Sequence, residues 1–320
     1  MKMQIGLQLW SQNTSWDSLR EHALLAEDLG FDQISTGDHL VPAAGGDMNL
    51  AQFECWQILS AWAALTRRVR IGALVSANSY RHPAILAKQV ATLDHITGGR
   101  AFLGLGAGWM EFEHEAYGMS FGTPTERLDR LTESVRIIRS LLDNSRTTFK
   151  GAHYTIRDAP AEPKPIQARL PIMIGGGGEK RTLRIAARYA DYWHAPGPAT
   201  DFARKVDILR AHSARIGRTD GGPTPFAGSS VMITEDRARV AARLVAISEA
   251  NRFESAHGAT LSRLLAFSGN PDQVAEYVAG YWRAGARGYI LHVASPHDAE
   301  TIRRFANDVR PRVESLVEAG

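Results

Sequence analysis

The 320-residue sequence has a single cysteine, Cys55. One cysteine cannot form an intrachain disulfide, and it excludes any zinc site built from several thiolates. The sequence also has no run of about 18 consecutive apolar residues, so it predicts no transmembrane helix. The first ten residues lack the long apolar core of a secretion signal and are typical of a first strand. We therefore expect a cytoplasmic protein that does not bind a membrane.

Long clusters of one charge are also missing. The chain has 37 Lys and Arg against 34 Asp and Glu, a formal net charge of +3. Its basic residues are spread along predicted helices, and none of them form a basic run interleaved with aromatics, which excludes a typical nucleic-acid surface. Hydrophobic residues make up 44% of the sequence, which is enough for a large buried core.

Several catalytic motifs are absent as well. The segment Glu111–His114 lacks the paired histidines of a helical zinc site, and the other histidines are scattered, so we expect no metal. No Gly-x-Ser-x-Gly motif is present, which argues against a serine hydrolase of the nucleophile-elbow type. No lysine directly ends a predicted strand, which argues against a Schiff-base aldolase.

Short apolar runs alternate with amphipathic stretches along the chain. Strands are predicted at 5–10, 33–36, 70–75, 101–105, 172–174, 191–194, 226–233 and 288–293. Helices are predicted at 16–29, 53–65, 83–96, 125–142, 180–189, 200–216, 235–265, 271–284 and 298–317. Eight strands, nearly all followed by a helix, favour the α/β class and a closed (β/α)8 TIM barrel. The alternative is an open doubly wound sheet, but no Gly-x-Gly-x-x-Gly follows the first strand.

No linker or composition shift divides the chain. We therefore expect one TIM-barrel domain over residues 1–320 with two insertions. The first is a β-hairpin and proline-rich segment at about 145–171, and the second is helical, at about 244–268.

The dipeptide Asp-His occurs twice, in two different settings. Asp38-His39 directly follows the second predicted strand, and the carboxyl ends of barrel strands carry the active site. We therefore predict His39 as the catalytic acid or base, since imidazole exchanges a proton near neutral pH. Its neighbour Asp38 is expected to point away along the strand and to have a role in orientation or structure rather than in the chemistry. Asp38 is also a candidate residue for binding the cofactor. Asp94-His95 ends a predicted helix instead, so it is expected on the opposite face of the barrel, where it contributes to stability.

A run of four glycines lies between a predicted strand and a helix. The residues are Gly175, Gly176, Gly177 and Gly178, followed by Glu179, Lys180 and Arg181. Glycine amides can turn toward a phosphate, and a helix N-terminus adds its dipole. Lys180 or Arg181 could supply a positive charge. The alternative is a flexible connection, but four glycines would be costly for a mere connection.

Other candidate pocket residues also follow predicted strands. Gly106 and Gly108 are small enough for a flat ring to approach the backbone, and Trp109 is either a wall of that pocket or a core residue. After the third strand come Ser76 and Asn78, and the Asn78 amide can both donate and accept at the edge of a heterocycle.

Together these segments resemble the bacterial luciferase-like monooxygenase superfamily, and within it the F420-dependent oxidoreductases. The resemblance covers nearly the whole chain. It rests on the segments 36–39 (TGDH), 78–84 (NSYRHPA), 93–100 (LDHITGGR), 103–109 (LGLGAGW) and 174–180 (IGGGGEK).

The resemblance implies a TIM barrel, usually a homodimer, that binds a flavin-type cofactor with its ring at the barrel mouth and its phosphate on the glycine run. His39 matches the active-site histidine of F420 enzymes. A non-prolyl cis peptide is expected near Ala73-Leu74, against the ring. The chain departs from the pattern at Trp109, where some relatives have a carboxylate, and at Gly37, where many have tryptophan.

We therefore predict an F420-dependent luciferase-like oxidoreductase that transfers a hydride between the deazaflavin and a small organic substrate. Two alternatives stay open: an FMN-dependent monooxygenase supplied with reduced flavin by a separate reductase, and a non-catalytic flavin-binding protein. The sequence does not indicate the substrate.

Overall fold

The computed structural model describes residues 2–43, 47–253 and 265–318. Nine parallel strands form one sheet in the order β3-β2-β1-β13-β10-β9-β8-β5-β4. Its strands are β1 (Gln4–Leu9), β2 (Gln33–Thr36), β3 (Arg70–Ala73), β4 (Ser76–Ala77), β5 (Leu103–Gly106), β8 (Ile172–Gly175), β9 (Tyr192–His194), β10 (Thr224–Ser229) and β13 (Gly288–Val293).

The first and last strands of this order belong to one stretch of chain. β3 pairs with β2, whereas β4 pairs with β5, and a bridge between Ile71 and Ala101 links the two ends of the sheet. Taken together, β3 and β4 are the third strand of an eight-stranded barrel. The predicted TIM-barrel fold is therefore confirmed for the described residues.

A non-prolyl cis peptide bond separates β3 from β4. It joins Leu74 to Val75, one residue later than the position near Ala73-Leu74 that the resemblance implied. The reason is that β3 continues its pairing with β2 through Ala73, and the Leu74 amide still donates to the Thr36 carbonyl at 2.9 Å. The irregular backbone starts only after that bond.

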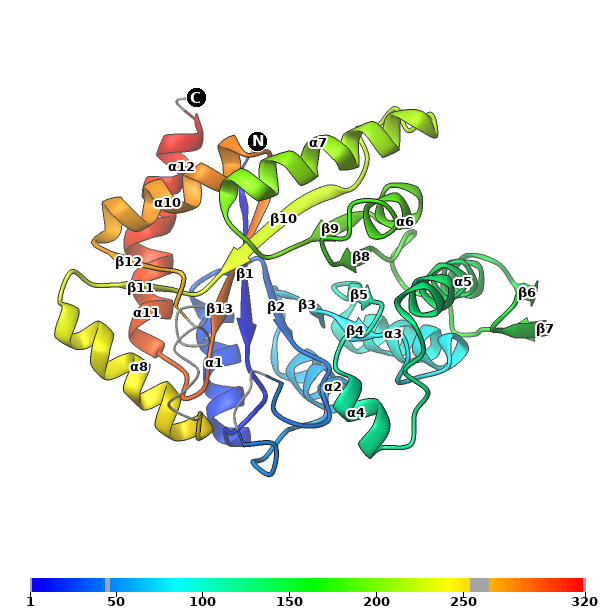
Figure 1. Ribbon diagram of the computed structural model, residues 1–320, viewed down its shortest axis with the longest axis horizontal. Helices are drawn as coiled ribbons and strands as arrows, with labels where there is room; N and C mark the ends of the chain where they lie inside the picture. Colours follow the sequence, from blue (N-terminus) through cyan, green and yellow to red (C-terminus); the bar gives the residue numbers. More distant parts are fainter. Residues whose placement is uncertain (1, 44–46, 254–264, 319–320) are drawn as a thin grey trace.

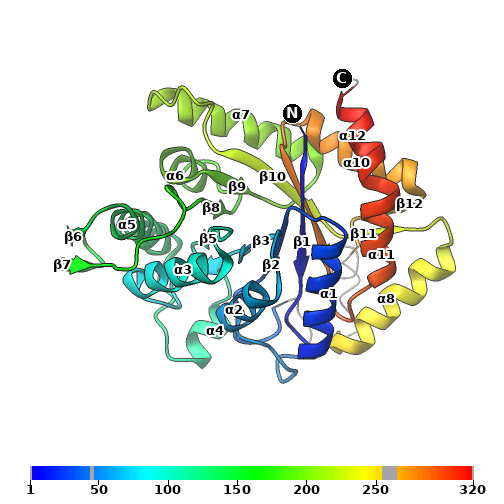
Figure 2. The same cartoon turned by 180° about the vertical axis from the view of Figure 1, so that it is seen from behind.

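Helices surround the sheet (Figures 1 and 2). They are α1 (Trp16–Asp28), α2 (Cys55–Leu65), α3 (Pro83–Thr97), α5 (Pro124–Asp143), α6 (Thr182–Tyr189), α7 (Ala199–Arg215), α10 (Pro271–Arg283), α11 (Ala299–Arg304) and α12 (Arg310–Glu318). The last predicted helix is divided, because a π-helical turn η1 (Phe305–Val309) lies between α11 and α12. No helix among the described residues is long and apolar enough to cross a membrane.

Two additions lie outside the barrel wall (Figure 1). The hairpin of β6 (Arg146–Lys150) and β7 (Thr155–Pro160) projects from one side. On the other side, β11 (Val231–Ile233) and β12 (Phe267–Gly269) pair with each other and bracket α8 (Arg237–Asn251).

The predicted single strand over 226–233 is therefore wrong. The barrel strand β10 ends at Ser229, and β11 turns to a new partner outside the barrel. Helical structure was predicted over 235–265. Of this, α8 covers 237–251, and residues 254–264 lie outside the described part of the chain.

Candidate active site

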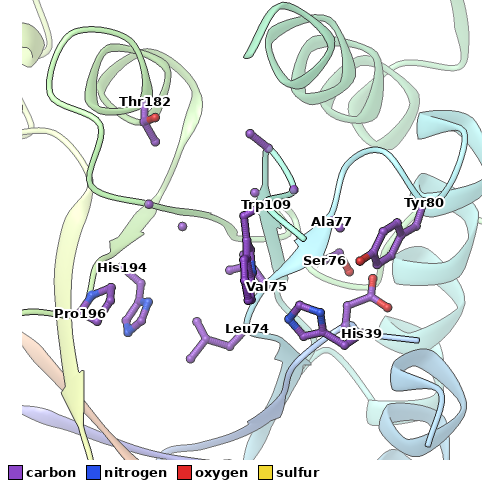
Figure 3. A pocket seen from close by; sticks show the side chains of 16 residues that line it. His39, Leu74, Val75, Ser76, Ala77, Tyr80, Trp109, Thr182, His194 and Pro196 are labelled. Atoms are coloured by element: carbon purple, nitrogen blue, oxygen red, sulfur yellow. The ribbon is translucent and has the colours of Figure 1, made fainter. Parts of the chain in front are cut away.

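A cavity of about 410 Å³ opens at the carboxyl ends of the barrel strands (Figure 3). Nine of the residues predicted from the sequence line it: Asp38, His39, Leu74, Ser76, Gly106, Gly108, Trp109, Gly175 and Gly176. Six others do not: Ala73, Asn78, Gly177, Gly178, Glu179 and Lys180. The cavity therefore collects residues from separate strand ends, as an active site in this fold requires.

His39 is bound to a carboxylate that the sequence did not indicate. Its Nδ1 lies 2.9 Å from Oε2 of Glu113, which the short helix α4 (Glu111–Ala116) carries. The Tyr80 hydroxyl donates to the same oxygen, and the backbone amides of Leu40 and Val41 donate to Oε1. Nε2 of His39 has no hydrogen bond to any described residue, so it is the ring nitrogen left for the cavity.

Burial and hydrogen bonds determine the protonation of the Glu113 carboxyl group and the Tyr80 hydroxyl beside His39. Burial raises the pKa of Glu113, but the hydrogen bonds from His39, Tyr80 and Leu40 outweigh burial and lower it. Burial and the neighbouring Glu113 carboxylate raise the pKa of Tyr80, so its hydroxyl stays a donor. An ionised Glu113 accepts the Nδ1 proton of His39, which leaves Nε2 to accept or return a proton.

Asp38 points to a different partner. Its carboxylate accepts two hydrogen bonds from Arg81, at 2.5 and 3.1 Å, and Arg81 also pairs with Glu54 at 2.5 Å. Burial raises the pKa of Asp38, and the Arg81 guanidinium counteracts part of that effect. This network anchors the chain beside His39.

The side chain of Val75 fills the space between two glycines. A Cβ atom on Gly106 would lie 2.8 Å from Val75, and one on Gly175 would lie 2.9 Å from it. Both distances are shorter than a real contact allows, so glycine is needed at both strand ends for Leu74-Val75 to protrude into the cavity. The cavity lining at this point is apolar.

Trp109 is a wall of the cavity. It is 64% exposed, and its ring meets the His39 ring edge-on with the centroids 5.6 Å apart. Figure 3 shows it between His39 and His194 in that view. The alternative of a core tryptophan is therefore wrong.

The glycine run lies beside a lysine from another element. Gly175 and Gly176 line the cavity, and a Cβ atom on Gly177 would lie 2.8 Å from Nζ of Lys205, on α7. Lys205 is largely buried and pairs with Asp201 at 2.6 Å. No strand-end or spacing signal in the sequence indicated Lys205.

The three charged residues after the glycines are arranged differently. Glu179 pairs with Arg204 at 2.5 Å, and Arg181 pairs with Asp129. Lys180 is exposed and has no ion pair with a described residue.

Three predicted residues occupy structural positions. Ala73 is fully buried in β3. The backbone N–H of Asn78 donates to the Gly106 carbonyl at 2.9 Å, and this bond holds the chain after β4 beside β5. His95 bonds the Lys164 carbonyl at 2.7 Å from the end of α3, outside the cavity. Among the described residues, no three His, Cys, Asp or Glu side chains gather closely enough to hold a metal ion.

Comparison with known proteins shows that the chain is similar to enzymes. The family model for luciferase-like monooxygenases matches residues 3–288. An F420-dependent glucose-6-phosphate dehydrogenase from Kineococcus radiotolerans is 28% identical over 330 residues, covering 97% of this chain and 96% of the relative. An FMNH2-dependent dimethylsulfone monooxygenase from Pseudomonas putida is 30% identical over 209 residues, covering 64% of this chain and 56% of the relative.

One solved structure shows the same fold over nearly the full length. It is an F420-dependent secondary alcohol dehydrogenase in complex with an F420-acetone adduct. The TM-score is 0.85 at 22% identity, with 98% of this chain and 99% of the other covered. At that identity the likeness establishes the fold alone.

Proposed function

Because the chain belongs to the luciferase-like monooxygenase family, we propose that it is an F420-dependent oxidoreductase acting on a small organic substrate. The observation that carries this proposal is the His39–Glu113 pair, in which a buried carboxylate fixes one imidazole nitrogen and leaves the other for the cavity. Hydride transfer to or from an alcohol or carbonyl group needs a proton acceptor or donor at that place. The resemblance also supports a homodimer.

The residues of the cavity fit such a cofactor. The volume of the cavity lies in the range of about 300–1,000 Å³ that is usual for ligand sites. Gly175 and Gly176 expose backbone without side chains, Thr182 adds a hydroxyl, and Lys205 lies alongside, so a phosphate would find donors and a positive charge. When bound, the deazaflavin ring supplies the hydride chemistry.

The protein's own groups handle the proton. In the direction of oxidation, Nε2 of His39 accepts a proton from the substrate hydroxyl, and in the direction of reduction it returns one. The Glu113 carboxylate, 2.9 Å from Nδ1, keeps the imidazole ring oriented. Leu74, Val75 and Trp109 present apolar surface, which limits water around the reacting atoms.

A titration of the purified protein with F420 and with FMN, followed by fluorescence, tests the choice of cofactor. We expect F420 to bind at least about tenfold more tightly, a difference of about 1.4 kcal/mol. Micromolar FMN binding without F420 binding would favour the monooxygenase supplied by a separate reductase. Tight F420 binding without turnover of any alcohol or carbonyl compound would favour a binding protein.

Replacing Lys205 tests the phosphate site. Lys205→Met should weaken F420 binding about tenfold or more, because a hydrogen bond to a charged group contributes about 1.5–3 kcal/mol. The matched control is Lys180→Met, at an exposed lysine outside the cavity, which should change the dissociation constant less than twofold. Equal effects of the two variants in the fluorescence titration would show that Lys205 does not bind the phosphate.

A further inference from the structure

A pocket of about 260 Å³ lies at the amino ends of β10 and β13, at the opposite end of these strands from the candidate active site. Three segments meet there: the C-terminal half of α7, the chain that leads into β10, and the turn that leads into β13. They contribute Leu209 and Arg210, residues 220–225, and Gly285 and Arg287. None of these residues lines the cavity at the carboxyl ends of the strands. We call this separate site the basal pocket.

Two arginines from different elements contribute guanidinium groups to the basal pocket. A Cβ atom on Gly285 would lie 3.5 Å from Nη2 of Arg210, so this side chain lies over the turn that also carries Arg287. Burial lowers the pKa of Arg287, and the positive charge of Arg210 lowers it further, so the two charges act on each other. Two like charges held together in a concave site are unfavourable unless an anion offsets them.

The contacts of the two guanidinium groups orient them without neutralising them. Nη1 of Arg287 donates to the Ala286 carbonyl at 2.7 Å, and its guanidinium carbon lies 4.2 Å from the centre of the Trp282 ring. These contacts leave Nε and Nη2 of Arg287 without a hydrogen bond to any described residue. Arg210 pairs with Asp207 at 3.7 Å, but both side chains are more than half exposed, so this ion pair contributes little.

The carboxylate in the lining, that of Asp220, already has its own partners. Arg218, which does not line the pocket, donates to both oxygens of Asp220, at 3.0 and 2.8 Å. The backbone N–H of Gly222 donates to Oδ1 at 3.0 Å. The hydrogen bonds from Arg218 and Gly222 lower the pKa of Asp220 to about 2. The charge of Asp220 is therefore balanced by Arg218, and the charges of Arg210 and Arg287 are left for a ligand.

The rest of the lining suits a phosphate group that carries a compact organic part. Guanidinium groups bind phosphate oxygens in pairs, and a phosphomonoester dianion offsets two positive charges where a monocarboxylate offsets one. Thr224 adds a hydroxyl that has no hydrogen bond to a described residue, and Leu209, Pro223 and Pro225 add apolar surface. The pocket equals about nine water molecules at their share of about 30 Å³ each, which is more than a phosphate group alone fills.

The backbone around the basal pocket is held in place by its own contacts. The N–H of Arg287 donates to the Pro225 carbonyl at 2.8 Å, which joins the turn before β13 to the start of β10. Gly222 has a φ of +85°, and a Cβ atom there would lie 2.2 Å from Oγ of Ser213 on α7, so glycine is needed for this close approach. Because these segments are already joined, a ligand would not have to order them, which lowers the cost of binding.

We propose that the basal pocket is a second ligand site, which binds the phosphate group of a small phosphomonoester through Arg210 and Arg287. The apolar residues of the lining contact the organic part of the ligand. No residue of the cofactor cavity takes part in this site. The inference is therefore independent of the proposed function and of the choice of cofactor.

Isothermal titration calorimetry of the full chain with glycerol 3-phosphate, at constant ionic strength, tests this site. We expect saturable binding with a dissociation constant of about 1 mM or lower, competition by inorganic phosphate and no binding of glycerol. Arg210→Met and Arg287→Met should each raise the dissociation constant about tenfold or more, because hydrogen bonds to a charged group are lost. Arg210 is exposed and makes no hydrogen bond to a described residue, so its replacement should leave the fold intact. Absence of saturable binding to the wild-type chain would overturn the inference.

Two controls distinguish the basal pocket from other ways of binding phosphate. Arg303→Met replaces an exposed arginine of α11 outside the pocket and should keep the dissociation constant within twofold. Equal weakening by Arg303→Met and Arg210→Met would show diffuse attraction to basic residues and overturn the inference. Lys205→Met removes the lysine beside the glycine run and should leave binding at the basal pocket unchanged. If Lys205→Met abolishes the binding and Arg210→Met does not weaken it, the phosphate binds at the glycine run and the inference is wrong.

Discussion

His39→Ala is expected to slow turnover by about 10²–10⁴-fold, the usual cost of removing a positioned acid or base. The affinity for F420 should stay within a few-fold, because the proposed phosphate contacts come from the glycine run and Lys205 instead. The reason for the loss is that, in the proposed mechanism, Nε2 of His39 accepts the proton in the cavity that the residue lines. Steady-state rates with an accepted substrate and a fluorescence titration with F420 measure the two quantities.

The control is the same substitution at the other Asp-His pair. His95 bonds a backbone carbonyl outside the cavity, so His95→Ala should alter thermal stability and leave kcat unchanged. A wild-type rate in His39→Ala would reduce His39 to a part of the pocket wall, and the proposed proton transfer would be wrong.

Glu113→Gln is expected to slow turnover about 100-fold or more, although the side chain keeps its shape. The glutamine oxygen still accepts from the amides of Leu40 and Val41. Its NH2 group donates toward Nδ1 of His39, which forces the imidazole proton onto Nε2 and removes the acceptor. We expect the loss in kcat rather than in the affinity for F420, because Glu113 holds the imidazole and does not line the cavity.

Glu115→Gln provides the control, since Glu115 lies on the same short helix and is exposed. It should leave both kcat and the affinity for F420 unchanged. If Glu113→Gln instead lowers the melting temperature and leaves kcat unchanged, Glu113 has a packing role only.

The sequence predicted the barrel because each strand and helix has a local pattern of apolar residues. The strand at 288–293 has the predicted bounds, and the third strand was expected at 70–75. Local patterns do not determine which strands pair with each other in the sheet. The third strand divides between β2 and β5, and the chain after Ser229 leaves the barrel for β12, because these pairings depend on residues far away in the sequence.

The same distinction between local pattern and tertiary contact explains which site residues could be predicted from the sequence. Gly106 and Gly175 end their strands, and His39 follows the end of β2 by three residues. The fold brings strand ends to one face, so the place of these residues followed from the pattern. Glu113 and Lys205 come from helices. Glu113 reaches His39 from 74 positions away, and only tertiary packing defines that contact. No residue spacing in a single sequence contains this information.

The small sheet of β11 and β12 lies outside the barrel, and its parallel pairing runs from Val231 opposite Phe267 to Ile233 opposite Gly269. Helix α8, which follows β11 in the sequence, ends at Asn251. The Asn251 side chain accepts a hydrogen bond from Gln12 and donates one to the Ser295 carbonyl, at 2.8 and 2.9 Å. One buried amide therefore fastens the outer helix to the chain that follows β1 and to the chain that follows β13, two neighbouring strands of the barrel.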